Sequence, residues 1–497
     1  MNPLRGKHIN LIIWTILSFP LTVLSQENTM YFMHTNPQAI HTNPALFYKC
    51  FTYIELPAIS SLKYSYGNSG FAYRDAFHYG TGTQNDSIQI DFDRLGRKMK
   101  NRNYIRNDYS VNILGAGFRI KNYYFHFNIS NHGETRIGLP GDLIALKDGN
   151  WDSSEEVPRD FKLGGLGVNA IDYIQIAAGV STKISEDLSV GLTAKYLMGM
   201  AGIVNRKSRL DLNTESDPIV LDAFIDYNIY ASFPVEVIPV QYTKNKVDTL
   251  IFEDSFSDPV HDFIFNKNRG LALDAGILYN YSDKIMLSAS IIDLGFIRWR
   301  SNINRFKSEG SFTFQGFDLG QYTPNTDESE LFQALLDSIE NSFQFTNSED
   351  PFTSFLTPKI YLGGLYKLNK KLAFGALLRT DLFDRRPHFA LTLTANYNPA
   401  DFFSGTISYS IMNNRLYNFG FGFALGRPGA QLFLVTDNIP LRYVRETNTG
   451  ILFPYSARTL NFRLGINLIF VCRELKWEGK PRAYRYVKAR GLCPAYD

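Results

Sequence analysis

Catalytic or metal chemistry would first show in the histidines, the cysteines and the glycine-rich motifs of the chain. The eight histidines are scattered, with neither a His-Glu-x-x-His pair nor a Cys/His spacing that suits zinc. The stretches at 67–70 and 164–167 lack the spacing of a nucleophile elbow and of a phosphate-binding loop. A Ser and a His brought together from distant strands would leave no local motif, but no residue pattern favours that arrangement. We therefore expect no metal, no cofactor and no enzymatic activity.

Five charged residues stand out instead, because each interrupts a segment of apolar and small side chains. Ionic groups in such surroundings must pair or contact water. They would form a bracing network of ion pairs or line a path for a solute, depending on the elements that position them. These residues are Lys195, Asp274, Arg379, Asp381 and Arg463.

The elements around these charges alternate with a period of two residues. From Phe389 to Tyr397, aromatic and aliphatic side chains alternate with small or polar ones, and the pattern recurs at 403–411 and 417–425. This period fits a strand and not a helix. A soluble sheet would place Lys and Glu on its polar face, whereas here that face is small and uncharged. An aromatic face opposite a small polar face is typical of a lipid-facing barrel wall.

Tight turns between alternating segments give a strand count. They recur at 121–122, 185–187, 282–284, 369–371, 398–401 and 427–429, and they resemble the short periplasmic turns of outer-membrane barrels. The sequence therefore predicts an all-β fold, a transmembrane antiparallel β-barrel of about fourteen strands with long extracellular loops. The segment 219–231 then falls in a loop as a hairpin arm. The predicted strands are 51–66, 108–120, 123–131, 171–184, 188–200, 270–281, 285–298, 357–368, 372–383, 387–397, 402–411, 416–425, 430–437 and 458–470.

Composition and the N-terminus indicate export to an outer membrane. Aromatic residues make up 14% of the chain, which suits many strands and interfacial girdles. A formal net charge of +3 is too small to indicate nucleic acid as a partner. Arg5 and Lys7 precede an apolar run at 9–24, which predicts a signal peptide over residues 1–25. We expect an outer-membrane protein surrounded by lipid, with a secreted β-sandwich as the alternative.

Two Asn-Pro pairs mark the region before the first strand, residues 26–49. They are Asn36-Pro37 and Asn43-Pro44, the second followed by Ala45. Proline fixes its own φ and disfavours the helical region for the residue before it, so both pairs form turns. The region is either a plug inside the barrel or an ordinary capped turn before the barrel, which we expect to span residues 50–470. Strand parity turns the five charged residues toward the lumen, where they brace a plugged interior or line a permeation path.

A basic tail follows the last strand, at residues 471–497. It holds seven Lys or Arg against three acidic residues, and we expect a periplasmic extension that binds an acidic group or a partner protein, or else a solvated tail. The three cysteines lie near the ends of the barrel. Cys50 precedes the first strand and Cys472 follows the last, so a disulfide between them is geometrically compatible with a closed barrel. A bond between Cys472 and Cys493 competes with it, and spacing does not choose.

Several stretches of the sequence resemble a family of Bacteroidota outer-membrane barrels catalogued as a domain of unknown function. They are the double Asn-Pro motif and the stretches 270–299, 312–319, 429–438 and 458–470. That family is similar in turn to the long-chain fatty-acid transporter barrels (FadL-like) and to the fourteen-stranded shuttle barrel of type IX secretion (PorV-like). In the fatty-acid transporters an Asn-Pro-Ala motif belongs to the N-terminal plug, which the resemblance maps to Asn43, Pro44 and Ala45. The basic tail departs from this pattern.

The sequence thus leaves two functions open. One is a plugged channel for a hydrophobic small molecule, which the Asn-Pro motif and the resemblance imply. The other is a non-transporting scaffold or accessory subunit of a secretion, gliding or envelope-assembly complex, which would bind a periplasmic or membrane protein through residues 471–497.

Overall fold

The computed structural model describes most of the chain between residues 28 and 471. The predicted signal peptide, the three cysteines and residues 472–497 lie outside the described part. Within it, no helix is long and apolar enough to cross a membrane. The described ranges are 28–48, 51–79, 88–152, 157–215, 220–233, 236–240, 249–253, 263–314, 346–383, 386–400, 402–412, 415–427, 429–438, 443–445, 452–454 and 458–471.

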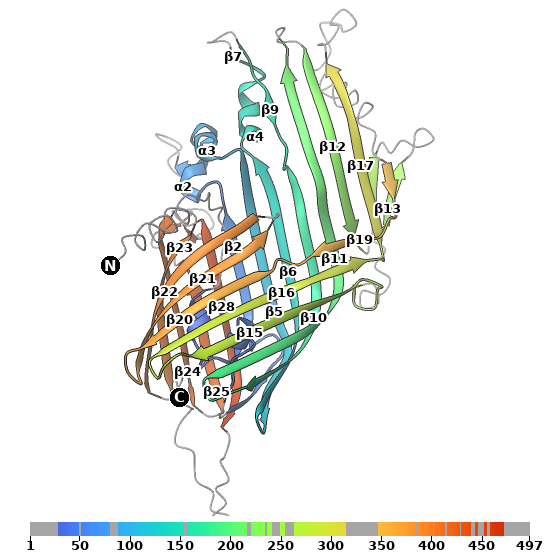
Figure 1. The fold of residues 1–497 in the computed structure, drawn as a ribbon. Helices are drawn as coiled ribbons and strands as arrows, with labels where there is room; N and C mark the ends of the chain where they lie inside the picture. Colours follow the sequence, from blue (N-terminus) through green and yellow to red (C-terminus); the bar gives the residue numbers. More distant parts are fainter. Residues whose placement is uncertain are drawn as a thin grey trace, which may run out of the picture.

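Fourteen antiparallel strands close into one barrel (Figure 1). The first consists of two pieces, β1 (Phe51–Glu55) and β2 (Leu62–Asn68), and both pair with the last strand, β28 (Thr459–Val471), which closes the wall. The predicted fold and strand count are therefore confirmed. The strands between are β5 (Arg102–Ile120), β6 (Tyr123–Pro140), β10 (Gly167–Lys183), β11 (Leu188–Thr214), β15 (Arg269–Asn280), β16 (Ile285–Trp299), β20 (Lys359–Lys367), β21 (Leu372–Phe383), β22 (Arg386–Ala400), β23 (Phe403–Met412), β24 (Arg415–Arg427) and β25 (Ala430–Asp437).

The two faces of the wall follow the alternation in the sequence. On β22, Thr392 is fully buried while the neighbouring Leu393 is 50% exposed, and on β23 Ser408 is buried while Ile407 is 62% exposed. Apolar side chains thus cover the outside, and small hydroxyl side chains face the interior. This is the arrangement of a wall that meets lipid on one side and a polar lumen on the other.

Several strands continue past the barrel into an outer sheet, at the upper end of Figure 1. The outer half of β11 pairs with β12 (Leu221–Ser232), which pairs with β17 (Ile303–Phe314) and through it with β18 (Thr346–Ser348). Much of the chain that we expected as loops after 131 and 200 is therefore strand. Backbone pairing between these strands continues beyond the predicted strand ends. Of the segment 219–231, residues 221–231 belong to β12 and lie in this outer sheet and not in the barrel wall.

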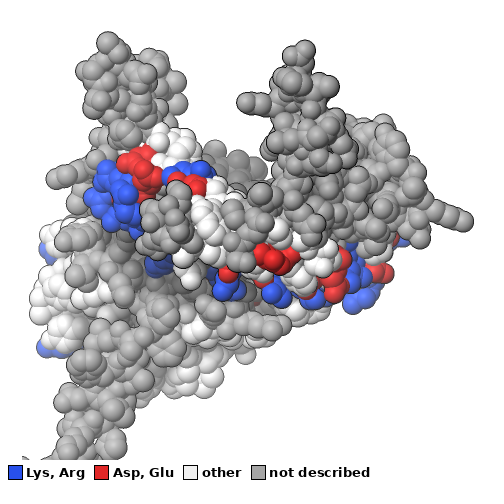
Figure 2. Space-filling view, turned by 90° about the horizontal axis from the view of Figure 1, so that it is seen from above, with Lys and Arg blue, Asp and Glu red and all other residues white. Residues whose placement is uncertain are grey.

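Ion pairs lie on the outer sheet, which also carries a small apolar cluster that includes Leu210 and Ile225. Lys207 binds Asp226 at 2.8 Å and Arg209 binds Asp211 at 2.6 Å. Figure 2 shows basic and acidic side chains interspersed over the described part of the upper face. Mixed charge of this kind keeps a surface soluble without creating a single-sign patch.

Short elements complete the described part of the chain. Two 3-10 helices, η1 (Thr29–Phe32) and η2 (Pro37–His41), precede the barrel. The others lie between the barrel strands: α2 (Tyr73–Ala76), β3 (Phe77–Tyr79), β4 (Ile88–Ile90), α3 (Phe92–Lys98), α4 (Asp142–Ala145), η4 (Leu146–Asp148), β7 (Trp151–Asp152), β8 (Val157–Pro158), β9 (Phe161–Lys162), β13 (Glu236–Val240), β14 (Thr249–Glu253), β19 (Phe352–Phe355), β26 (Tyr443–Arg445) and β27 (Leu452–Pro454).

A charge on the outer face of the wall should destabilise the barrel in lipid. Ile407 lies halfway along β23 and faces outward, so Ile407→Arg is expected to lower the free energy of unfolding by about 2–4 kcal/mol. Urea unfolding in lipid vesicles measures the change. Ile90→Arg is the matched control, because Ile90 is also half exposed but lies on β4, outside the barrel. Equal losses in the two variants would contradict a lipid-facing position for Ile407.

Candidate functional site

Residues 28–48, called here the N-terminal segment, lie inside the barrel. Met30, Tyr31, Phe32 and Ala45 are each at most 2% exposed. The two Asn-Pro pairs shape the segment locally: the side chain of Asn36 accepts a hydrogen bond from the backbone N–H of Gln38 at the start of η2. Capping of this kind starts a helical turn without a long helix.

The second pair acts in the same way. The side chain of Asn43 accepts a hydrogen bond from the backbone N–H of Ala45 at 2.9 Å, and its amide donates to the backbone carbonyl of Ile277 on β15. Both Asn-Pro pairs are therefore capped turns, and both lie within the buried segment. The five residues of the predicted plug motif thus occupy the barrel interior.

Polar bonds hold the N-terminal segment to the wall on several sides. The backbone N–H of Thr29 donates to Asp437 on β25 at 3.0 Å, and Gln38 donates to Asn467 on β28 at 2.6 Å. On other strands, the Ser181 hydroxyl donates to the Leu46 carbonyl, and the Ser290 hydroxyl donates to the Thr42 carbonyl. The segment therefore bridges the lumen and does not lie along one strand.

Glycines line the wall where the segment touches it. A Cβ atom added to Gly363 on β20 would come within 2.8 Å of Tyr31, and one on Gly375 of β21 would come within 2.6 Å of Phe32. Such distances are shorter than real Cβ contacts allow. The wall thus lacks side chains where the segment needs the space. The inward glycines with this property are Gly191, Gly276, Gly363, Gly375, Gly420 and Gly422.

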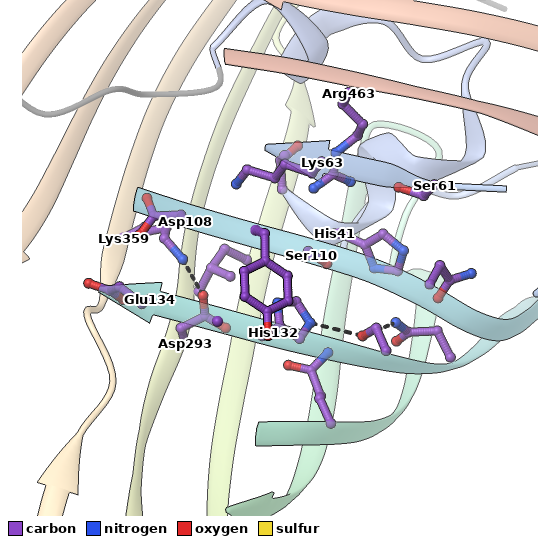
Figure 3. Close-up of a pocket in the computed structure, with 18 of the residues that line it drawn as sticks. His41, Ser61, Lys63, Asp108, Ser110, His132, Glu134, Asp293, Lys359 and Arg463 are labelled. Atoms are coloured by element: carbon purple, nitrogen blue, oxygen red, sulfur yellow. Dashed lines mark hydrogen bonds and ion pairs between the residues drawn. The ribbon is translucent and has the colours of Figure 1, made fainter. Parts of the chain in front are cut away.

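A cavity of about 120 Å³ lies between the N-terminal segment and the wall. His41 and Thr42 of the segment form part of its lining, and the rest comes from the inner faces of several strands (Figure 3). We call it the interior cavity. Its charged lining residues are Lys63, Arg106, Asp108, Glu134, Lys195, Asp293, Lys359, Arg379 and Arg463.

A buried ion cluster forms one part of the cavity lining. The Lys195 ammonium lies 2.7 Å from Asp274 and 2.6 Å from Asp293, and Lys359 also binds Asp293. Asp293 sits at a β-bulge of β16, where the pairing register with β15 shifts. Its φ of 63° is unusual for a residue other than glycine, and its backbone N–H donates to Asp274 at 2.8 Å. The bulge thus turns Asp293 inward.

A second ion cluster connects β5, β6 and β21. Arg379 binds Asp381 at 2.7 Å, and Arg106 lies 2.7 Å from Asp108 and 3.6 Å from Asp381. Glu134 joins this cluster through Arg106, at 3.7 Å. Each guanidinium thus meets at least one carboxylate, as buried charges require.

Two further cations face the cavity from the closing strands. Lys63 on β2 and Arg463 on β28 are direct cross-strand partners, and both line the cavity near His41. The His41 imidazole lies 4.0 Å from the buried carboxylate of Glu55.

The structure places all five charged residues selected from the sequence in the interior, each at most 9% exposed. It joins Lys195 to Asp274 and Arg379 to Asp381, while Arg463 lies apart at the closing strands. Sequence analysis missed Arg106, Asp108, Glu134, Asp293 and Lys359. No group of three or more His, Cys, Asp or Glu among the described residues is arranged to hold a metal ion.

Removing the Lys195 ammonium from its ion cluster should lower the free energy of unfolding substantially. Lys195→Met leaves Asp274 and Asp293 without their shared cation in a buried site, and we expect a loss of about 3–5 kcal/mol in the free energy of unfolding. Lys207→Met removes a half-exposed partner of Asp226 on the outer sheet, and should lower the free energy of unfolding far less, because water screens an exposed ion pair. Urea unfolding in vesicles compares the two, and equal losses would show that Lys195 is not a buried partner.

The chain is similar to several known barrel proteins in structure. No curated protein sequence matches the chain. Solved structures that are similar include a Pseudomonas aeruginosa FadL homologue (9% identity, covering 91% of this chain and 99% of that chain, TM-score 0.35). They also include the Ralstonia pickettii toluene transporter TbuX (7%, 91% and 96%, 0.37) and the Pseudomonas putida toluene transporter TodX (8%, 90% and 95%, 0.35). A family model matches residues 44–437, and the chain therefore belongs to DUF5723, a family of unknown function.

Proposed function

We propose that the protein is an outer-membrane channel that its N-terminal segment closes from inside. The observation that carries this proposal is the set of inward glycines under the segment. A barrel wall with no segment inside it would be more stable with larger inward side chains. These glycines instead leave space that Tyr31, Phe32 and their neighbours fill. The apolar outer face supports a position in lipid, and the polar inner face supports a lumen that suits water.

The way in which the segment is held supports reversible closure. Its contacts with the wall include many hydrogen bonds to hydroxyl, amide and carboxylate groups, such as Thr29 to Asp437 and Gln38 to Asn467. Bonds of this kind exchange with water at a net cost of about 0.5–1.5 kcal/mol each between neutral groups and about 1.5–3 kcal/mol when the acceptor is a carboxylate. The segment forms short 3-10 turns and no strand of the barrel. Its departure would expose apolar side chains such as Phe32 and Ile40, but it would break no strand pairing of the wall.

We keep the predicted hydrophobic small molecule as the cargo, with one restriction on its chemistry. The interior cavity is lined by charged and polar side chains from both ion clusters. A purely apolar molecule would separate these groups from water without giving them partners. We therefore propose a cargo that carries at least one polar group into the cavity.

The alternative, a scaffold in a secretion or envelope-assembly complex, rested on residues 471–497. That tail lies almost entirely outside the described part of the chain. No contact of the described residues favours a scaffold over a channel, so the scaffold function remains a prediction.

A side chain added under the segment should open the channel. Gly363→Val would place its side chain against Tyr31 and Phe32, and we expect the segment to be displaced and the conductance in planar bilayers to rise several-fold. Gly364→Val is the matched control: the neighbouring glycine would meet only Leu287, at 3.8 Å, and conductance should stay at the level of the unmodified protein. Equal conductance of the two variants, with both barrels folded, would contradict closure by the segment.

A further inference from the structure

We propose that three lysines on neighbouring tight turns of the barrel bind the headgroup of an anionic phospholipid. The residues, called here the lysine patch, are Lys284, Lys370 and Lys371. They lie at the end of the barrel opposite the outer sheet (Figure 1). The proposal goes beyond the channel, because it concerns the rim of the wall and requires no transport.

The backbone brings the two turns together and fixes their shape. The first turn joins β15 to β16, and the second joins β20 to β21. The backbone N–H of Lys367, at the end of β20, donates to the backbone carbonyl of Lys284 at 2.8 Å. In the second turn, the Asn369 side chain accepts hydrogen bonds from the backbone N–H groups of Lys371 and Leu372. The lysine side chains therefore start from a defined and shared backbone.

The lysine patch is exposed and carries net positive charge. All three of its lysines are exposed. The two turns, 281–284 and 368–371, contain one acidic residue, Asp283, so three lysines leave a formal charge of +2. The next turn along the rim, 185–187, carries two acidic residues and no basic one. The positive charge is thus confined to one part of the rim, where it favours an anion.

Large apolar and aromatic side chains end beside the lysine patch. Tyr281, Tyr366 and Leu368 are all exposed and stand next to the two turns. Aromatic residues of this kind mark the level of the lipid headgroups on a barrel wall. A lysine at that level lays its apolar stem along the lipid and holds its ammonium among the phosphates. This position favours a lipid over a soluble anion as the occupant.

The charge of the patch selects among phospholipids. A zwitterionic headgroup brings its own ammonium, which the lysines repel, whereas an anionic headgroup such as phosphatidylglycerol brings only the phosphate charge. The tight turns are predicted to be periplasmic, so the bound lipid would come from the periplasmic leaflet of the membrane.

The test counts the lipids that stay bound to the full chain in native mass spectrometry. The protein is held in an uncharged detergent and titrated with phosphatidylglycerol or phosphatidylethanolamine that have the same acyl chains. The unmodified protein should bind phosphatidylglycerol at least about fivefold more tightly than phosphatidylethanolamine. In the variant Lys284→Gln/Lys370→Gln/Lys371→Gln that preference should fall to about twofold or less, because the three charges are gone. Heat-modified gel mobility checks that each barrel is folded.

Two further variants separate the patch from total charge and from folding. Lys207→Gln/Arg209→Gln/Lys307→Gln removes three cations from the outer sheet and should keep the full preference. Lys284→Arg/Lys370→Arg/Lys371→Arg conserves the charge and should keep it as well. The proposal is overturned if the unmodified protein shows no preference, or if the two Gln variants lose it equally. Displacement of phosphatidylglycerol by an equal concentration of glycerol phosphate, which has no acyl chains, would show that the patch binds a soluble anion and not a lipid.

Discussion

Lipid imposes one constraint on this chain from which its other features follow. Every backbone N–H and C=O in the membrane must be paired, and outward side chains must be apolar. Because a strand alternates its faces, the polar side chains of the wall are then confined to the interior, as Thr392 and Ser408 are. Polar groups in a narrow lumen need partners, and the N-terminal segment supplies them. Thr29 donates a hydrogen bond to Asp437, and Gln38 donates one to Asn467.

The same constraint explains the two ion clusters. A charged side chain on a barrel strand can only face inward, and once there it must be neutralised. Lys195 and Asp274 both face inward through ordinary alternation on β11 and β15, where they are diagonal neighbours: Asp274 pairs directly with Thr193, and Lys195 binds its carboxylate from two residues further along. Asp293 reaches the same ammonium only because a bulge on β16 shifts the parity of that strand. The bulge lets four strands, β11, β15, β16 and β20, contribute to one cluster, since Lys359 of β20 also binds Asp293.

These origins explain what the sequence could predict. Lipid imposes alternation such as that of Thr392 and Leu393 along the strands of the wall. The number of strands and the closure of the barrel could therefore be predicted. Lys195 and Asp274 could be found because the pairing of β11 with β15 has no register shift around them. Asp293 could not, because a bulge reverses parity there, although the apolar pair Ile291-Ile292 just before it was a signal. Arg106 and Glu134 were missed because they lie beyond the predicted ends of their strands, at residues 108 and 131, whereas pairing continues through both residues.

Contacts between distant parts of the chain were beyond prediction for another reason. The Asn-Pro pairs predict capped turns from neighbouring residues, and the structure contains them. The space for Tyr31 is made by Gly363, which no local pattern connects to it. His41 and Thr42 lie on the segment and also line the cavity. A ligand that contacts them therefore binds the closed barrel more tightly than a barrel from which the segment has left. By linkage, such a ligand stabilises closure in proportion to that difference in affinity.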